Sequence, residues 1–398
     1  MKHFRVQFFI LVAVFIPLAT LLIIQLARGY RFDWQKKKFT PRGILVATSV
    51  PDGALVYLNG QLKTATNNTF FIQPGSYLVE IKKDGYFDWK KELKIEKELV
   101  TKTEAFLFPK ATGLKPLTFL GAQNPSLSPD GTKIVYSLSL KEGENAGLWA
   151  LDLIEFPLEI ISKVPRKIVQ SNQTLDFSKA SILWSFDSRQ ILVSLGGQSF
   201  LLDPGQFTPN QNLINISWNI KSIKESWKKE QEKQFQSKFK KLPSPLQEIL
   251  KDKAANLIFS PDEEKVVYLA TDSAKIPSDL IPPLPASSTQ KEEREIKPNK
   301  WYVYDLKEDK NFEIKFSNSN FQFSINPTWF FTSRHLVLAE KEKISIVEYD
   351  GTNLTPIFSG PFENSYVFPS PNSSKIIILT NFGQPPDQLP NLYSINLH

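Results

Sequence analysis

Few residues in this sequence have the type and spacing that active-site chemistry requires. Histidine occurs only at His3, His335 and His398, and cysteine is absent. A histidine-rich metal site and a cysteine nucleophile are therefore excluded. The first and last histidines are terminal. His335 follows a turn at the start of an expected strand, where we predict a structural or exposed role.

Two aspartates in turns are the remaining candidates for acid–base chemistry or calcium binding. Asp130 and Asp262 each follow a Ser-Pro pair, and an aspartate there bonds to the backbone of its own turn, which explains its presence without chemistry. The sequence has no Gly-x-Ser-x-Gly motif and no phosphate-binding glycine loop. We therefore predict no catalytic, cofactor-binding or metal-binding residue, no cofactor, and a protein that is not an enzyme.

The turn around Asp130 belongs to a repeated strand–turn–strand phrase, NPSLSPDGTKIVY at Asn124–Tyr136. Proline, aspartate and glycine favour the tight turn, and the β-branched and aromatic residues after it favour a strand. The same phrase returns at Ala255–Leu269, and weaker copies occur at Ser181–Ser194, Asn326–Leu338 and Tyr366–Leu379. The phrase resembles the TolB-like propeller repeat, well at Ser128 and Ser260, fairly at Ser370 and poorly at Ser185 and Phe330.

Stacking such units around an axis buries the apolar faces that one unit leaves exposed, so residues 112–398 are predicted to form a β-propeller. Five phrases favour five blades, with six as the alternative. A β-sandwich with similar hairpins is a second reading. We expect Leu114–Leu120 to be the outer strand of the last blade and to pair with Leu392–Leu397. The tryptophans in or beside these strands are expected to be mostly core: Trp149, Trp184, Trp218, Trp301 and Trp329.

The N-terminal apolar run, Val6–Ala27, is long enough to cross a membrane as a helix. We predict an uncleaved signal-anchor at residues 1–29; a cleaved signal peptide is the alternative. The count of Lys and Arg places the C-terminal side in the cytoplasm, whereas the short basic N-terminus resembles an ordinary signal-anchor. We favour the second orientation, with the C-terminal domains outside.

A polar linker is expected at residues 30–42, followed by a small β domain at residues 43–110. Its motifs are Pro51-Asp52-Gly53-Ala54, Val56-Tyr57-Leu58-Asn59-Gly60, Pro74-Gly75-Ser76-Tyr77 and Lys83-Asp84-Gly85-Tyr86. In this order they resemble the PEGA domain, a small β-sandwich associated with prokaryotic surface proteins and with binding. The family's Gly-x-Thr-Pro turn is absent, so the loop at Gln61–Asn68 is expected to differ.

Two insertions interrupt the propeller region. Residues 218–253 have helical periodicity and predict an amphipathic helix or helix pair that caps the propeller or binds a partner. Residues 275–300 are rich in proline and predict a long loop over one face of the ring.

The sequence thus predicts a mainly β protein with an N-terminal transmembrane helix, a PEGA β-sandwich and a propeller with a helical insertion. Its formal charge of +7 is modest and local, so we expect no nucleic-acid partner. The expected function is a membrane-anchored cell-surface binding or scaffold protein of a prokaryotic envelope, whose partner is a protein, peptide or envelope polymer. A propeller hydrolase acting on envelope glycan or lactone, and a purely structural envelope component, are the alternatives.

Overall fold

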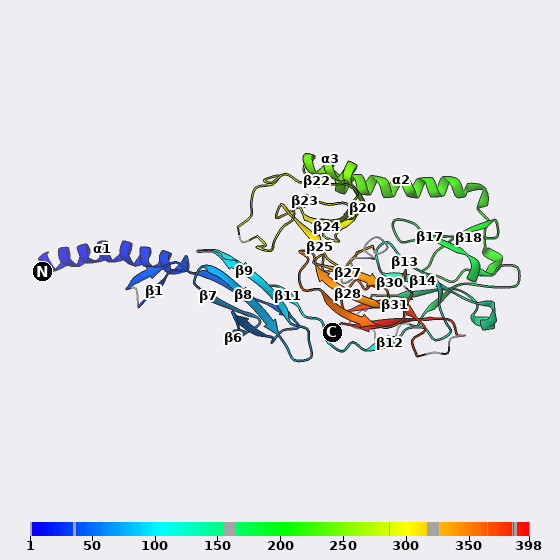
Figure 1. Cartoon of the computed structure of the whole chain (residues 1–398), viewed down its shortest axis with the longest axis horizontal. Helices are drawn as coiled ribbons and strands as arrows, with labels where there is room; N and C mark the ends of the chain where they lie inside the picture. Colours follow the sequence, from blue (N-terminus) through cyan, green and yellow to red (C-terminus); the bar gives the residue numbers. More distant parts are fainter. Residues whose placement is uncertain are drawn as a thin grey trace. The chain divides into compact units, whose positions relative to one another are not determined.

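The chain forms two compact units (Figure 1). The computed structural model describes residues 2–34, 37–154, 164–285, 287–316, 326–363, 365–383, 385 and 388–397. The first unit contains Met1–Leu107 and Pro283–Lys291, and the second contains Phe108–Pro282 and Glu292–His398. A short segment of the second insertion therefore belongs to the first unit, which differs from the prediction that the whole loop lies over the propeller.

The first unit begins with one long helix, α1 (Lys2–Ala27). Its stretch Phe8–Ala27 is apolar, long enough to cross a membrane, and not buried against the protein. The helix ends at Ala27, and Gly29 two residues later has a φ of +88°, in the left-handed region that favours glycine. By length and composition α1 is a membrane anchor or a signal sequence.

The predicted polar linker is instead a small hairpin, so that prediction is wrong. Strand β1 (Arg31–Asp33) pairs with β2 (Lys38–Thr40). The cause is aromatic packing between strands, since Phe32 lies opposite Phe39 with ring centroids 5.5 Å apart.

The small β domain of the first unit consists of a four-stranded sheet packed on shorter sheets. The four-stranded sheet has the order β6-β5-β8-β9, with β6 (Gln61–Ala65), β5 (Leu55–Leu58), β8 (Gly75–Lys82) and β9 (Trp89–Ile95). The others are β3 (Gly43–Ala47) with β7 (Asn68–Ile72) and β10 (Val100–Lys102), and β4 (Ser49–Val50) with β11 (Ala105–Phe106).

Its core lies between these sheets and includes Leu45, Val56, Ile81 and Trp89. The expected loop at 61–68 is largely the strand β6, because Asn59 and Gly60 both adopt left-handed φ values and return the chain antiparallel to β5.

The second unit is a β-propeller. Its described strands form five antiparallel sheets of three or four strands, in line with the favoured number of blades, and one two-stranded pair. Blade 1 is β13 (Gln123–Leu127), β14 (Lys133–Leu138), β15 (Gly147–Asp152) and β16 (Arg166–Gln170). Blade 2 is β17 (Ser181–Trp184), β18 (Ile191–Leu195) and β19 (Gln198–Leu202). Blade 3 is β20 (Ala254–Phe259), β21 (Lys265–Ala270), β24 (Lys300–Asp305) and β25 (Lys310–Ile314). Blade 4 is β26 (Thr328–Trp329), β27 (His335–Glu340), β28 (Lys343–Glu348) and β29 (Thr355–Ser359).

Blade 5 joins the two ends of the propeller region, as predicted. It contains β30 (Val367–Pro369), β31 (Lys375–Thr380), β32 (Asn391–Asn396) and β12 (Leu114–Pro116). Leu114 pairs with Ile395, so the first strand of the region is the outer strand of the last blade. This closure covers an edge that would otherwise be exposed.

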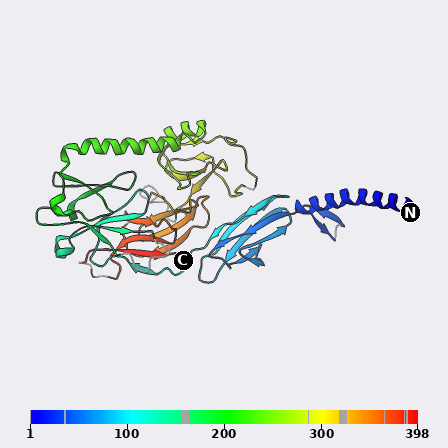
Figure 2. The ribbon, with the colours of Figure 1, turned by 180° about the vertical axis from the view of Figure 1, so that it is seen from behind.

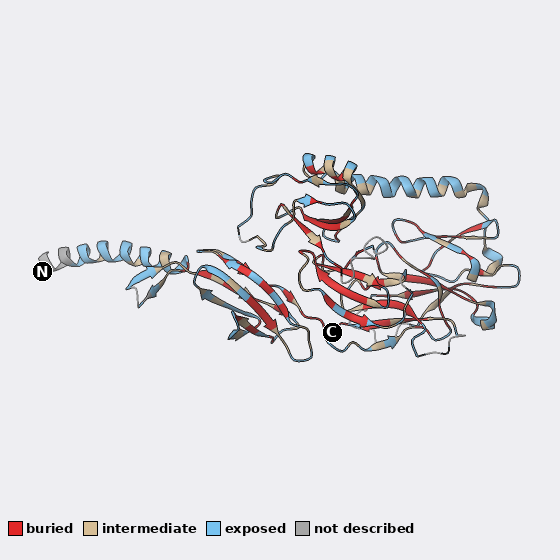
Figure 3. Ribbon diagram, in the orientation of Figure 1, coloured by how far each residue is buried: buried red, intermediate tan, exposed pale blue. Residues whose placement is uncertain are grey.

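The middle strands carry the core, and Figure 3 shows them as the most buried segments. Val135 and Ile191 belong to one cluster between blades 1 and 2, and Val267 and Leu336 belong to another between blades 3 and 4. Both faces of a middle strand are covered by neighbouring blades, which explains the continuous apolar runs after each turn.

The first insertion contains two helices, as predicted: α2 (Ile220–Phe239) and α3 (Ser244–Lys253). Helix α3 buries Leu246 and Leu250 against blade 3, whereas no residue of α2 is fully buried (Figures 1 and 2). The second insertion begins and ends in a short pair, β22 (Ala274–Lys275) with β23 (Glu295–Ile296).

Candidate functional site

The five repeat turns share one geometry, including the two whose sequences match poorly. In each, the residue before the turn pairs with the residue seven positions later, near the start of the next strand: Leu127 with Ile134, Trp184 with Ile191, Phe259 with Val266, Trp329 with Leu336 and Pro369 with Ile376. Every turn contains one residue with a positive, left-handed φ: Gly131, Ser188, Glu263, Ser333 and Ser373. The turns and the residues beside them are therefore equivalent across the blades, whereas further from the turns the pairing shifts by one residue in blades 1 and 3.

The turn aspartates are engaged within their own turns, as the sequence indicated. The Asp130 carboxylate accepts hydrogen bonds from the Ser128 hydroxyl at 2.6 Å and the Thr132 main-chain nitrogen at 3.0 Å. Burial opposes ionisation of Asp130, but these hydrogen bonds outweigh it and lower the pKa of the carboxyl. Asp262 is held in the same way by Ser260 and the Glu264 nitrogen. The turn explains both residues.

The single histidine whose side chain is described is a packing residue. His335 is buried, its Nδ1 lies 2.9 Å from the Thr332 hydroxyl, and its ring packs edge-on against Phe108 and Phe330. His3 and His398 lie outside the described side chains. Within the described part of the chain, no group of three or more His, Asp or Glu residues is arranged to hold a metal ion.

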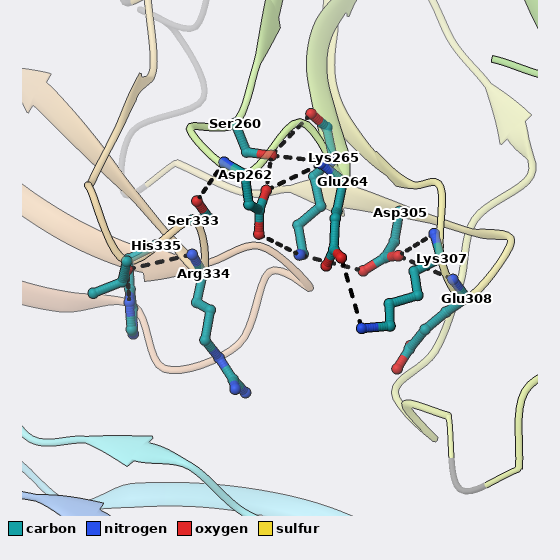
Figure 4. Close-up of polar contacts among 11 residues, drawn as sticks. Ser260, Asp262, Glu264, Lys265, Asp305, Lys307, Glu308, Ser333, Arg334 and His335 are labelled. Carbon is teal, nitrogen blue, oxygen red and sulfur yellow. Dashed lines mark hydrogen bonds and ion pairs between the residues drawn. The ribbon is translucent and has the colours of Figure 1, made fainter. Parts of the chain in front are cut away.

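The most buried ion pair lies between two strands of blade 3, β21 and β24, where it faces Tyr349 of blade 4 (Figure 4). The Lys265 ammonium lies 3.7 Å from the Asp305 carboxylate and 5.0 Å from the centre of the Tyr349 ring. The Asp305 carboxylate also accepts hydrogen bonds from the main-chain N–H groups of Lys307 and Glu308. Burial raises the pKa of Asp305, and the nearby Lys265 limits the rise. Each charge has its partner inside the fold, so the cluster is structural.

Two of the seams between blades carry the same pair of contacts. The indole of Trp184 donates to the Ser126 carbonyl at 3.3 Å, and that of Trp329 donates to the Ile258 carbonyl at 2.9 Å. The Asp130 nitrogen donates to the Ser188 hydroxyl, and the Asp262 nitrogen donates to the Ser333 hydroxyl (Figure 4). Trp184, Trp301 and Trp329 are buried as predicted, but Trp218 is 83% exposed and is not core.

The innermost strands present the remaining set of equivalent side chains. Strands β13, β17, β20, β26 and β30 each begin a sheet and pair with one neighbour, so their other edges face the axis of the propeller. Four residues before the first residue of each turn stand Asn124, Ser181, Asn256, Asn326 and Tyr366. All but Tyr366 are exposed. These five positions precede their turns by the same number of residues, and two of them, Asn256 and Asn326, approach each other between blades 3 and 4. We call this set the axial row.

The axial row is rich in neutral amides, and two of the same inner strands also carry exposed aliphatic side chains. The Asn124 amide donates to the Ser178 carbonyl at 3.1 Å, and the Asn256 amide lies 3.5 Å from the Asn326 amide oxygen. Nearer the turns, Leu183 and Ile258 are 45% and 38% exposed. Carboxamides donate and accept hydrogen bonds without carrying charge, which suits peptide groups or sugar hydroxyls better than ions.

The sequence analysis predicted no site residue and missed the axial row. The signal was present, because three of the five phrases carry asparagine at this position. The other two copies carry Ser181 and Tyr366 at the same distance before their turns.

Comparison with protein families confirms the first resemblance. Residues 42–110 match the model of the PEGA domain. The match covers the small β domain of the first unit. No curated protein matches the chain.

Comparison with solved structures finds TolB proteins and other propellers. TolB from Acinetobacter baumannii is 11% identical with a TM-score of 0.24, over 80% of this chain and 60% of that chain. A luciferin-regenerating enzyme is 10% identical with a TM-score of 0.28, over 72% and 95%. The β-propeller domain of the Trilobed protease from Pyrococcus furiosus is 12% identical with a TM-score of 0.20, over 89% and 96%. The TolB-like resemblance of the repeat is thus found again. With TM-scores this low, the propeller assignment rests on the five sheets and their shared register.

Proposed function

We propose that this protein is a membrane-anchored binding protein of a prokaryotic cell surface, held by α1 and carrying its PEGA domain and propeller outside the membrane. It is not an enzyme in this proposal. Its propeller binds a protein, a peptide or a cell-envelope polymer through the axial row. The observation that carries the proposal is the set of exposed and uncharged side chains at one distance before the repeat turns, led by Asn124, Asn256 and Asn326.

The composition of the axial row supports binding over catalysis. A hydrolytic propeller needs converging carboxylates or a central ion, whereas these positions carry amides, a hydroxyl and a phenol. The turn carboxylates that come closest to such a role already accept hydrogen bonds within their turns. A rigid sheet scaffold with exposed polar side chains at equivalent positions is suited to recognition.

A triple variant tests the binding site. Full-length protein in detergent micelles is screened against purified cell-wall polymer, a glycan array and a peptide library. For the strongest binder, replacing Asn124, Asn256 and Asn326 with alanine is expected to weaken binding about 10- to 100-fold, at roughly 0.5–1 kcal/mol per lost hydrogen bond.

The matched control replaces three exposed side-chain amides of the same unit that lie away from the inner strands, Asn212, Gln231 and Gln236. It is expected to bind like the parent. If the triple variant binds as tightly as this control, the axial row is not the binding site.

Protease treatment of intact cells tests the topology. A C-terminal tag is expected to be removed by external protease while the membrane is sealed. Protection of the tag until lysis would place the propeller in the cytoplasm, as the count of positive charges around α1 indicates.

A further inference from the structure

Strand β9 lies at the edge of the four-stranded sheet of the first unit. The order β6-β5-β8-β9 leaves it paired only with β8, and its residues Lys90, Glu92 and Lys94 are exposed. In an antiparallel pair, alternate residues direct their main-chain N–H and C=O groups away from the partner strand. Such an edge can accept a further strand.

A segment from the second insertion occupies this edge within the same compact unit. The Thr289 hydroxyl donates to the Glu92 carbonyl at 3.0 Å and accepts from the Lys94 N–H at 3.4 Å. The Gln290 amide also donates to the Glu92 carbonyl, at 2.7 Å. We call residues 287–291 the clasp.

The Thr289 hydroxyl makes the two hydrogen bonds that one residue of an added strand would make. In a parallel pair, a residue donates its N–H to one carbonyl and accepts the N–H two residues further along. Glu92 and Lys94 are related in this way, and one hydroxyl satisfies both groups. The edge of β9 is therefore able to bind an extended segment, and the clasp satisfies it through side chains alone.

The chain that follows the clasp is fixed to blade 3 by stronger contacts. Arg294 donates a hydrogen bond to the Pro277 carbonyl and forms an ion pair with the buried Asp309. The Asp309 carboxylate also accepts a hydrogen bond from the Tyr304 hydroxyl at 2.6 Å. The Asn311 amide donates to the Glu293 carbonyl at 2.6 Å. Between the clasp and β9, the neutral Thr289 and Gln290 side chains form hydrogen bonds with main-chain groups, each worth roughly 0.5–1.5 kcal/mol. The clasp is the part of the insertion that can leave its site without disturbing the anchor.

We propose that the outer edge of β9 is a docking site for an extended peptide, that the clasp is its resident occupant, and that a peptide with hydroxyl and amide side chains takes its place. The clasp is tethered and acts at a local concentration of the order of millimolar, so a competing peptide must be present at a similar concentration. Binding at β9 is separate from the axial row and does not depend on the function proposed for it.

Hydrogen exchange of the Lys94 amide tests the resident state. In full-length protein in detergent micelles, replacing residues 287–291 with Gly-Ser-Gly-Ser-Gly is expected to accelerate this exchange at least about fivefold. Thr289→Val, which keeps the shape and removes the hydroxyl, is expected to act in the same direction. The control Thr69→Val changes an exposed threonine on β7 and is expected to leave Lys94 unaffected. Equal exchange rates in the parent and the clasp-replaced protein would overturn the proposal.

A peptide added in trans tests the docking site itself. A synthetic peptide of residues 287–293 at millimolar concentration is expected to restore slow exchange of the Lys94 amide in the clasp-replaced protein. The same peptide with Thr289→Val and Gln290→Ala is expected to fail. If neither peptide protects the amide, or both protect it equally, β9 does not recognise the clasp sequence and the proposal is wrong.

Discussion

Gly131 in the turn of blade 1 gives the sharpest test of how the blades are arranged. Its φ of +71° lies in the left-handed region, and a Cβ there would lie 2.5 Å from the Cζ of Phe331 in the turn of blade 4. These blades are not consecutive in sequence. The contact therefore exists only if the blades curve around a common axis and their turns converge at one end of it.

The expected cost of Gly131→Ala has two parts. Left-handed backbone costs a residue with a side chain about 1 kcal/mol. The overlap with Phe331 adds about 1–3 kcal/mol, because the ring must move out of its position. We expect the free energy of unfolding to fall by about 2–4 kcal/mol in total.

Two further variants separate these parts. Gly197 has a similar φ of +83°, but a Cβ there would meet no atom within 4 Å, so Gly197→Ala is expected to cost only the backbone part, about 1 kcal/mol. Adding Phe331→Ala to Gly131→Ala is expected to remove the overlap, so the two changes together cost less than the sum of their separate effects.

Urea unfolding of the full-length protein in detergent, followed by tryptophan fluorescence, is the assay. Six of the eight tryptophans lie in the second unit, so the signal reports mainly on the propeller. If Gly131→Ala costs no more than Gly197→Ala, and its effect simply adds to that of Phe331→Ala, then the turns of blades 1 and 4 do not meet and the arrangement described here is wrong.

Three other changes have definite expected outcomes. A hydrogen bond from Lys90, reinforced by the charge of Lys90, lowers the pKa of the Glu80 carboxyl below its unfolded value of about 4.3. The pair therefore stabilises the fold fully above about pH 4.3. This stabilisation is lost as the pH falls through the lowered pKa of Glu80. Glu80→Gln is expected to cost about 1 kcal/mol at pH 7 and to flatten the pH dependence of urea unfolding between about pH 5 and 3; an unchanged pH profile would contradict this. Trp329→Phe leaves a carbonyl of blade 3 without its donor and is expected to cost about 1–3 kcal/mol in the same assay, whereas Trp218→Phe, at a side chain 83% exposed, should cost less than about 0.5 kcal/mol. Ser373→Gly relieves a left-handed φ of +55° and is expected to raise the free energy of unfolding by about 0.5 kcal/mol, measured as a slightly higher thermal midpoint. A lower thermal midpoint would mean that the Ser373 side chain stabilises the turn.

Local features of the sequence determined most of the strands. The turn residues around Asp130 and Asp262 and the apolar runs after them fix each hairpin, because a tight turn and a period-two pattern need no distant partner. The same holds for Asn59-Gly60 in the small β domain. The apolar segment Val6–Ala27 likewise determines its helix by composition alone.

Contacts between distant segments decided the rest, and no local pattern encodes them. The hairpin at Phe32 and Phe39 depends on packing between two aromatic rings, and it replaced an expected linker. The proline-rich loop was expected to lie over the propeller, but Thr289 of that loop forms a hydrogen bond with the edge strand β9, nearly two hundred residues earlier in the chain. A free strand edge can be covered by any segment that reaches it, so sequence spacing cannot say which one does.

The axial row lies between these two cases. Its asparagines can be read from the repeat, at one distance before each turn. Only the structure shows that the pairing shifts by one residue beside Asn124 and Asn256, which changes the direction of the side chains there. The sequence determined which residues the repeat carries, and the tertiary structure decided which of them share a surface, since only closure of the blades around an axis gathers one residue from each.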